Sequence, residues 1–202
     1  MSELIHPRHP REERTLVLVK PDGVKRGLAG EIIRRIEMRG FKIIALAMIF
    51  ATKELVEGHY ENSDTYLKNL AGKTKSTYEK YGIDVKQEMG TEDDLEIGRM
   101  VRGWLVDFMV SGPIIKIAVK GVHVIESIRK ICGNTMPALA EMGTIRGDYS
   151  TDSAACANRD HRTVRNLVHA SGNAEEAEKE LAYWFEPAEF HDYKRAEEDI
   201  MY

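Results

Sequence analysis

The sequence predicts an α+β fold in which helices pack on one face of an antiparallel sheet. Runs of β-branched and apolar residues have strand character, and they occur at 15–20, 41–50, 114–121 and 163–170. Helical patterns separate them, so the order is β-α-β-α-β-α-β once two polar segments are set aside. This order is typical of a ferredoxin-like layer. With 202 residues, 43% of them hydrophobic, the chain is long enough for one core with additions.

The first half of the chain contains two predicted strands and two predicted helices. In order they are a strand at 15–20, a turn at PDG (21–23), a helix at 28–40, a strand at 41–50 and a helix that begins in 51–60. Ile32, Ile33 and Ile36 share one face of the first helix, and Gly40 stops it. Thr52 can cap the second helix.

The second half repeats the alternation of strands and helices. The predicted elements are an amphipathic segment that ends at Gly112–Pro113, a strand at 114–121, a helix at 122–133, mostly loop at 134–150, a strand at 163–170, a helix at 173–185 and a C-terminal tail with helical content. Glycine follows the last apolar residues of the 122–133 helix and serves as its stop signal.

Two polar segments are interpreted as insertions into a single domain at 14–202, preceded by a flexible lead at 1–13. Residues 61–98 are rich in Lys, Glu, Asp, Gly and Thr with little apolar periodicity, so we expect short helices and loops. Residues 150–162 form a second, smaller insertion. A surface elaboration is the simpler role for 61–98, and a lid or a subunit contact is the alternative.

Composition narrows the classes of partner. The net charge of −4 argues against charge-driven binding to nucleic acid or to an anionic membrane. The longest apolar run, IIALAMIF, is too short to cross a bilayer, and the polar N-terminus has no secretory core. Cys132 and Cys156 have no metal-like spacing and are expected to be free thiols. A cytoplasmic location is therefore expected.

The segment RNLVHAS (165–171) places a histidine at the end of the last strand. The simplest interpretation of His169 is a side chain that satisfies a local hydrogen bond. Ser171 can cap the helix that follows, and Glu180 lies within that helix. A carboxylate on one ring nitrogen would fix the tautomer and make the other nitrogen a better nucleophile.

Several cations and donors are candidates for binding phosphate. Lys20, Arg129 and Arg146 carry the charges that neutralise phosphoryl oxygens, although each alone is most often a solvated surface charge. Thr135 and Asn166 can donate to phosphate or ribose oxygens, or can simply serve a turn and a strand edge.

Two short motifs point to functions that their context excludes. AGKTKS (71–76) suggests a phosphate-binding P-loop, but the pattern requires a glycine where the chain has Leu67, and no strong strand precedes it. The RGD at 146–148 suggests an adhesion tripeptide. Without a secretory signal, Asp148 is better explained as holding its loop through a salt bridge.

Motifs along the chain together resemble the nucleoside diphosphate kinase family. They are VKPDGVKRGLAGEIIRRIEMRGFKI, HY at 59–60, SGP at 111–113, GNTMP, GTIRGD at 143–148, and RNLVHAS followed by EAEKELAYWF. They keep the family's order and most of its spacing over roughly three-quarters of the chain.

The resemblance implies a function and a role for each candidate residue. The family transfers the γ-phosphoryl group of a nucleoside triphosphate such as ATP to a nucleoside diphosphate, and so maintains nucleotide pools for nucleic acid synthesis. The transfer is ping-pong through a phosphohistidine, Mg²⁺ bridges the nucleotide phosphates, and the proteins are commonly homo-oligomers. The matching positions are His169 as nucleophile, Lys20, Arg129, Thr135, Arg146 and Asn166 as nucleotide contacts, and Tyr60, Ser171 and Glu180 as supporting residues.

The chain departs from the family pattern at four places. They are the longer segment between Tyr60 and Ser111, the addition between Arg146 and Asn166, Gly172 in place of an aspartate, and Met136 where asparagine is frequent. The first departure obscures the aromatic residue that stacks on the base: Tyr66 is a candidate, whereas counting places Lys68 nearby. Losing the carboxylate at 172 is expected to weaken the helix start by a few tenths of a kcal/mol, about as much as a poorer cap.

Two other functions are compatible with the same fold. One is a nucleotide-binding or regulatory module without turnover, and the other is a phosphohistidine relay that passes phosphate to a partner protein. Degenerate relatives are expected to lose the histidine or the phosphate-binding cations, and this chain keeps all of them. The kinase is therefore the favoured hypothesis.

Overall fold

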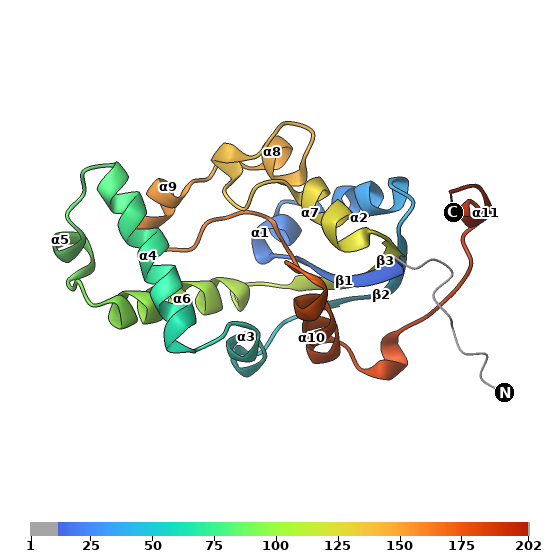
Figure 1. Cartoon of the computed structure of the whole chain (residues 1–202), viewed down its shortest axis with the longest axis horizontal. Coiled ribbons are helices and arrows are strands. Elements are labelled where there is room, and N and C mark those ends of the chain that lie inside the picture. The colour runs from blue at the N-terminus through green and yellow to red at the C-terminus, as the bar shows by residue number, and fades with distance from the viewer. Residues whose placement is uncertain (1–11, 202) are drawn as a thin grey trace.

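A four-stranded antiparallel sheet forms the centre of the computed structural model, which describes residues 12–201 (Figure 1). Its strands are β1 (Glu12–Val19), β2 (Lys42–Ile49), β3 (Ile114–Val122) and β4 (Val168–Ala170). They lie in the order β2-β3-β1-β4, and each neighbouring pair is antiparallel. The predicted α+β, ferredoxin-like sheet is thus confirmed. The lead predicted at 1–13 lies outside the described residues except for Glu12 and Glu13, which belong to β1.

Helices and short 3-10 turns connect the strands. In chain order they are α1 (Pro21–Lys25), α2 (Ala29–Met38), α3 (Lys53–His59), α4 (Asp64–Lys80), α5 (Val85–Met89), α6 (Asp94–Met109), α7 (Val124–Cys132), η1 (Pro137–Leu139), α8 (Ile145–Tyr149), α9 (Ala154–Arg159), α10 (Ala174–Trp184), η2 (Pro187–Glu189) and α11 (Glu198–Met201). Thr52 caps α3 as predicted, because its side chain accepts a hydrogen bond from the Leu55 amide. No helix in the described part of the chain is long and apolar enough to cross a membrane.

Three local predictions need correction. The PDG segment opens helix α1 rather than forming a simple turn, because Pro21 occupies the first helical turn, where it needs no amide hydrogen. The segment 61–98 contains the 17-residue helix α4, which its polar surface had concealed. The last strand covers only Val168–Ala170.

Helices cover both faces of the sheet, so the prediction of one covered face is incomplete. Val17 and Val19 of β1 pack with α2 and α7 on one face. Leu16 and Leu18, which alternate with them, pack with α3, α6 and α10 on the other. Figure 1 shows α2 and α7 above the sheet, and α3 and α10 below it.

Helices α4, α5 and α6 build a separate small core, and α9 of the second polar segment packs against α4. We call these four helices the outer lobe. Its buried residues include Ala71, Tyr78, Met89 and Ile97. The Tyr78 hydroxyl donates to the backbone oxygen of Asn158 in α9 at 3.3 Å, which joins the two segments. Figure 1 shows this lobe at one end of the molecule, opposite the end where α11 lies.

Both misleading motifs have structural roles. The GKT sequence lies inside helix α4, where Thr74 is buried and donates to the backbone oxygen of Leu70 at 3.1 Å. Asp148 of the RGD tripeptide accepts hydrogen bonds from Arg35 at 2.6 Å and from the Gly143 amide at 2.7 Å. It therefore holds its loop, as the sequence indicated.

Helices α4 and α6 cross at close range, and this contact gives a stability test. A Cβ on Gly98 would lie 2.3 Å from the Leu67 backbone oxygen, whereas a Cβ on Gly103 of the same helix would meet nothing within 4 Å. We expect Gly98→Ala to lower the free energy of unfolding by about 2 kcal/mol, because the helices must separate. Gly103→Ala should raise it by about 0.5–1 kcal/mol through reduced backbone entropy. Denaturant unfolding of both variants checks this, and equal effects would contradict the close crossing.

Candidate active site

Strand β4 places His169 next to the central strand, opposite Leu18. The His169 Nε2 lies 2.8 Å from Oε1 of Glu180 in α10. The other carboxylate oxygen of Glu180 accepts from the Ser171 hydroxyl at 2.6 Å, and the Ser171 oxygen accepts from the Leu16 amide at 3.3 Å. Burial opposes the charge on Glu180, but its hydrogen bonds to His169 and Ser171 hold the pKa below its ordinary value. An ionised Glu180 favours the proton on Nε2, so the Nδ1 lone pair of His169 is available.

The position of Ser171 corrects one expectation about the helix start. Asn173, not Ser171, caps α10, because the Asn173 side chain accepts from the Glu176 amide at 2.9 Å. Glu175 and Glu176 supply carboxylates to the first turn, so glycine at 172 does not leave the helix start without negative charge. A Cβ on Gly172 would lie 2.6 Å from Oε2 of Glu176, so the glycine gives that carboxylate room.

A second histidine, His59, packs against His169. The His59 ring meets the His169 ring edge to face, with centroids 4.8 Å apart, and its Nδ1 accepts from the Trp184 indole at 3.2 Å. Burial, and to a lesser extent His169, lower the pKa of His59 to about 3. His59 is therefore neutral at physiological pH.

His59, His169 and Glu180 also satisfy a simple geometric test for a metal site. Their donor atoms lie within 4.8 Å of one another. However, Glu180 already accepts from His169 and Ser171, and His59 already accepts from Trp184. The cluster is thus explained as a hydrogen-bonded support for His169.

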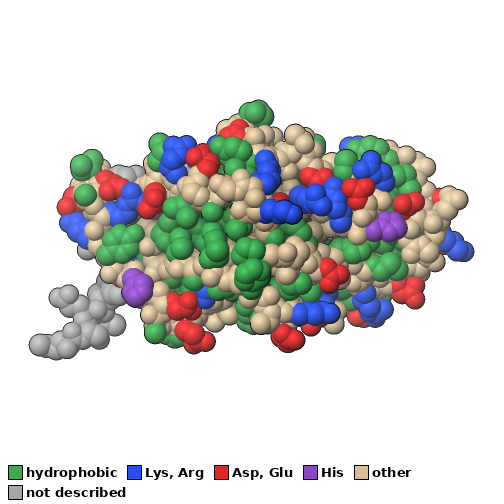
Figure 2. Space-filling model, turned by 180° about the vertical axis from the view of Figure 1, so that it is seen from behind, with side chains coloured by type: hydrophobic (Ala, Val, Ile, Leu, Met, Phe, Trp, Pro, Cys, Tyr) green, Lys and Arg blue, Asp and Glu red, His purple; other side chains and the backbone are tan. Residues whose placement is uncertain are grey.

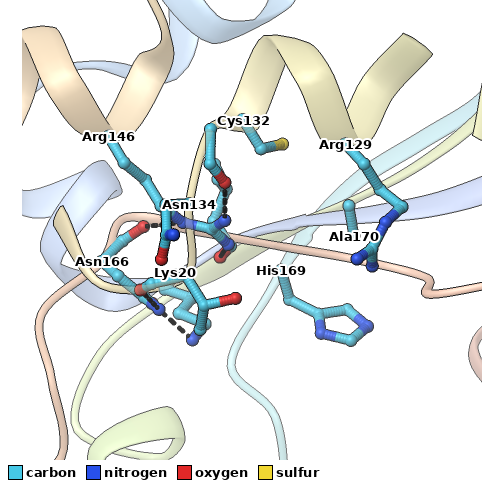
Figure 3. Close-up of a pocket in the computed structure, with 11 residues that line it drawn as sticks. Lys20, Arg129, Cys132, Asn134, Arg146, Asn166, His169 and Ala170 are labelled. Carbon is cyan, nitrogen blue, oxygen red and sulfur yellow. Dashed lines mark hydrogen bonds between the residues drawn. The ribbon is translucent and has the colours of Figure 1, made fainter. Parts of the chain in front are cut away.

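A cavity of about 300 Å³ lies beside His169 (Figure 3). Its polar lining residues are Lys20, Arg129, Asn134, Thr135, Arg146, Asn166 and His169. Figure 3 shows Arg129 extending from α7 next to His169. Lys20, Asn166 and Arg146 lie across the cavity from Arg129. None of the lining residues in the described chain is acidic, so the cavity is suited to an anion.

Lys20 and Asn166 form the floor of this cavity. The Lys20 ammonium donates to Oδ1 of Asn166 at 2.8 Å. The side-chain Nδ2 of Asn166 donates to the backbone oxygen of Thr135 at 2.9 Å. Burial, with the nearby charge of Arg146, lowers the pKa of Lys20 to about 8. Asn166 therefore fixes the direction of a lysine whose charge the protein has only partly compensated.

Arg146 is buried, with its guanidinium held by backbone oxygens. Nε donates to Asn166 at 3.1 Å, Nη1 to Gly133 at 2.7 Å and Nη2 to Val168 at 2.8 Å. These bonds join the end of α7 to the approach to β4. Burial lowers the pKa of Arg146 from its ordinary value, yet a guanidinium stays charged inside proteins at neutral pH.

The backbone makes a sharp turn just before β4. Leu167 has a φ of +69°, a left-handed conformation that costs a non-glycine residue on the order of 1–2 kcal/mol. The Asp22 carboxylate accepts from the Leu167 amide at 3.0 Å, and the Leu167 oxygen accepts from the Lys20 amide at 2.8 Å. This turn lets Asn166 and His169 face the same cavity.

The structure brings most of the predicted site residues together. The cavity is lined by all six of the residues predicted to act as nucleophile or nucleotide contacts: Lys20, Arg129, Thr135, Arg146, Asn166 and His169. Tyr60 and Tyr66 line a second cavity of about 670 Å³ on the other side of His169, whereas Lys68 is exposed on α4.

Sequence reasoning missed His59, Trp184 and Asp22 as supports of the site. His59 and Trp184 stand in the HY and AYWF motifs, and Asp22 in PDG, so the signal was present. Their partners are distant in the chain, and no local pattern predicts those contacts.

Comparisons with known proteins point to one family. A sequence model of the family described as nucleoside diphosphate kinase matches residues 13–83 and 97–190. A nucleoside diphosphate kinase of Pyrobaculum aerophilum is 46% identical over 177 residues, covering 88% of this chain and 97% of the relative. One from Gallus gallus is 34% identical over 190 residues, covering 94% of this chain and 96% of the relative.

Solved structures agree with the sequence comparisons. The crystal structure of an NDP kinase from Pyrobaculum aerophilum has a TM-score of 0.87 at 43% identity, over 90% of this chain and all (100%) of that one. A Borrelia burgdorferi nucleoside-diphosphate kinase, a transition-state mimic with bound vanadate and ADP, has a TM-score of 0.74 at 33% identity. The match covers 93% of this chain and 95% of the Borrelia burgdorferi chain.

The neutral, buried His59 gives a prediction for stability against pH. Its pKa is about 3 in the folded chain and near 6.5 in the unfolded chain, so the unfolded chain binds more protons between these values. The contribution of His59 to the free energy of unfolding is therefore present above pH 6.5 and is lost as pH falls toward 3. The free energy of unfolding, measured by denaturant titration at several pH values between 3 and 6.5, should rise with pH more steeply for the wild type than for His59→Gln. Equal slopes would contradict a neutral His59.

Proposed function

Because the chain belongs to the nucleoside diphosphate kinase family and transfers the γ-phosphoryl group of a nucleoside triphosphate to a nucleoside diphosphate, we propose that His169 carries this group as a phosphohistidine. The transfer is then ping-pong, and one site serves donor and acceptor in turn. One observation carries the proposal: His169 lines a cationic cavity while Glu180 holds its Nε2.

The first half-reaction forms a bond between His169 Nδ1 and the γ-phosphorus, while the bond from that phosphorus to the β-phosphate oxygen breaks. The diphosphate leaves with the electron pair, and the Nε2 proton stays hydrogen-bonded to Glu180. The second half-reaction runs the same bonds in reverse toward another diphosphate. Glu180 thereby stabilises the positive charge that develops on the imidazole.

The cations supply most of the stabilisation in this mechanism. Phosphoryl transfer passes through a loose transition state whose charge is spread over the peripheral oxygens. Lys20, Arg129 and Arg146 neutralise that charge from the cavity wall. Asn166 orients Lys20, and Thr135 offers a hydroxyl at the rim.

Mg²⁺ is the proposed cofactor, held by the nucleotide phosphates. It fits the cavity in this manner, because none of the lining residues within the described chain offers a carboxylate to a hard cation. When bound, it neutralises phosphate charge during transfer.

Tyr60 is proposed to support His169 from the second cavity, and Tyr66 to contact the nucleotide base there. Both line it together with His169 and Glu180. Tyr66 is therefore a better candidate for base stacking than the exposed Lys68. A site that grips phosphates more than base edges is expected to accept several bases.

We further propose a homo-oligomer in the cytoplasm, built from one domain at 14–202 with additions at 61–98 and 150–162. Strand β2 is at the edge of the sheet and exposes Leu46 and Met48, and Phe50, which follows the strand, is exposed as well. Hydrophobic side chains also gather across the face of the molecule that Figure 2 shows. Cys132 and Cys156 are free thiols, which suits a reducing compartment. Binding to nucleic acid or to a membrane is not expected, since the net charge is −4.

Labelling with γ-³²P-ATP and Mg²⁺ tests the nucleophile. Wild type should gain an acid-labile label that GDP removes as GTP, and His169→Ala should gain none. Glu180→Gln should keep the reaction but slow label transfer by about 10–100-fold, because the ring loses its orienting charge. Label on His169→Ala, or ATP binding without label in wild type, would refute the phosphohistidine.

The lowered pKa of Lys20 predicts how activity depends on pH. Because this pKa is about 8, kcat/KM for nucleotide should fall as pH rises through 8 and the free lysine loses its charge. The titration of Lys20 does not itself favour unfolding in this range, because the Lys20 contribution to the free energy of unfolding rises between pH 8 and 10.5.

Lys20→Arg is the matched variant for this profile. Its guanidinium stays charged, so its lower activity should be flat across pH 8. A falling profile in both proteins would assign the titration to another group.

A further inference from the structure

Arg146 and Asn166 touch one another although a loop of the chain separates them. The Arg146 side chain donates to the Asn166 backbone oxygen across 20 positions of sequence. The loop leaves the site after α8, includes α9 of the outer lobe, and returns at Asn166. Two residues of the cavity therefore depend on how this loop is closed.

The neck of the loop is closed by the side chain of Asp152. Its carboxylate accepts from Arg162 Nη1 at 2.6 Å and from Nη2 at 3.1 Å, a two-bond ion pair across the neck. Oδ2 also accepts from the Arg165 amide at 2.8 Å, one residue before Asn166. Beside it, the Ser150 hydroxyl donates to the Arg165 oxygen at 2.7 Å.

Two further hydrogen bonds hold the backbone and the carboxylate of Asp152 in place near the cavity. Its backbone oxygen accepts from the Ala138 amide at 3.1 Å, next to the turn that carries Thr135. Its Oδ1 accepts from the Ser153 amide at 3.0 Å. The Asp152 side chain is only 12% exposed, so solvent weakens the ion pair with Arg162 less than it would at the surface.

The far end of the loop is tied to the outer lobe. Tyr78 of α4 donates to Asn158, and the His161 ring stacks on Trp104 of α6 with centroids 5.8 Å apart. This anchor lies away from the cavity, whereas the Asp152 carboxylate accepts a hydrogen bond from the backbone amide of Arg165, the residue before Asn166. The neck, not the tip, thus sets where the chain enters the strained turn at Leu167.

We propose that Asp152 is a positioning residue for the nucleotide-phosphate cavity: by closing the neck of the loop, it fixes Arg165 and so holds Asn166 against Lys20. This inference rests on the proposed function only in taking nucleotide phosphate as the ligand of the cavity. It gives the 150–162 segment a role in binding. Because the network is preformed, nucleotide binding does not have to order it.

Calorimetric titration with ADP and Mg²⁺ tests the proposal on the folded protein, without requiring turnover. Asp152→Ala should raise the dissociation constant for ADP by about ten-fold, less than the roughly hundred-fold cost of an ångström-scale misplacement of reacting groups. Asp152→Asn should give a smaller rise, because it can still accept from Arg165 but loses the ion pair. In steady state, KM should rise more than kcat falls.

Asp160→Ala is the matched control. Asp160 lies in the same loop and pairs with Arg162 Nε at 3.2 Å, but the hydrogen bonds and ion pairs of its side chain go to Arg159 and Arg162 and not to 163–166. Its ADP affinity should stay within about two-fold of wild type, as for a surface change.

The outcomes separate this inference from the proposed function. A folded Asp152→Ala protein that binds ADP like wild type would overturn the role of Asp152, and Asp152→Asn decides in the same way if the alanine variant does not fold. A wild type that binds ADP but forms no phosphohistidine would refute the mechanism and leave the binding comparison valid. A wild type that does not bind ADP would refute both.

Discussion

The site depends on a buried arginine held by backbone carbonyls rather than by a carboxylate. Arg146 bonds to Gly133, Asn166 and Val168, which belong to the end of α7, the loop return and the start of β4. A carboxylate partner would cancel the charge, but carbonyl dipoles solvate it and leave its sign intact. The same bonds that stabilise the guanidinium therefore also create a positive cavity. Lys20, oriented by Asn166, extends this field to the floor of the site.

The charges around His169 have opposite signs on its two sides. On the cavity side lie cations, and on the other side Glu180 is anchored by Ser171 and the central strand. His59 is too buried to compete for a proton, so it fills space against His169 without adding charge. His169, the proposed nucleophile, thus lines the cationic cavity while its Nε2 is held by a fixed anion. This separation is what a reversible transfer requires, because neither half-reaction meets a rearranged site.

Sequence patterns predicted the parts of the fold that repeat with a regular period. The continuous apolar run of β1 and the apolar face of α2 were sufficient to place the first strand and the first long helix. The outer lobe was not predictable in this way, because α4 buries Ala71, Thr74 and Tyr78, a face too polar to stand out. In the site, short motifs placed the residues of the cavity, but contacts such as Asp152 with Arg165 depend on loop geometry that has no periodic signal.

The topology of the sheet also determines when this protein can fold during synthesis. Strand β1 is central, yet its two neighbours, β3 and β4, begin at Ile114 and Val168. At ribosomal rates of 5–20 residues per second, β1 waits on the order of 5–20 s for its first partner. During that time the apolar strand has two open edges, which other chains can pair with. Because β4 and α10 carry His169 and Glu180, the candidate active site is assembled only in the last stage of translation.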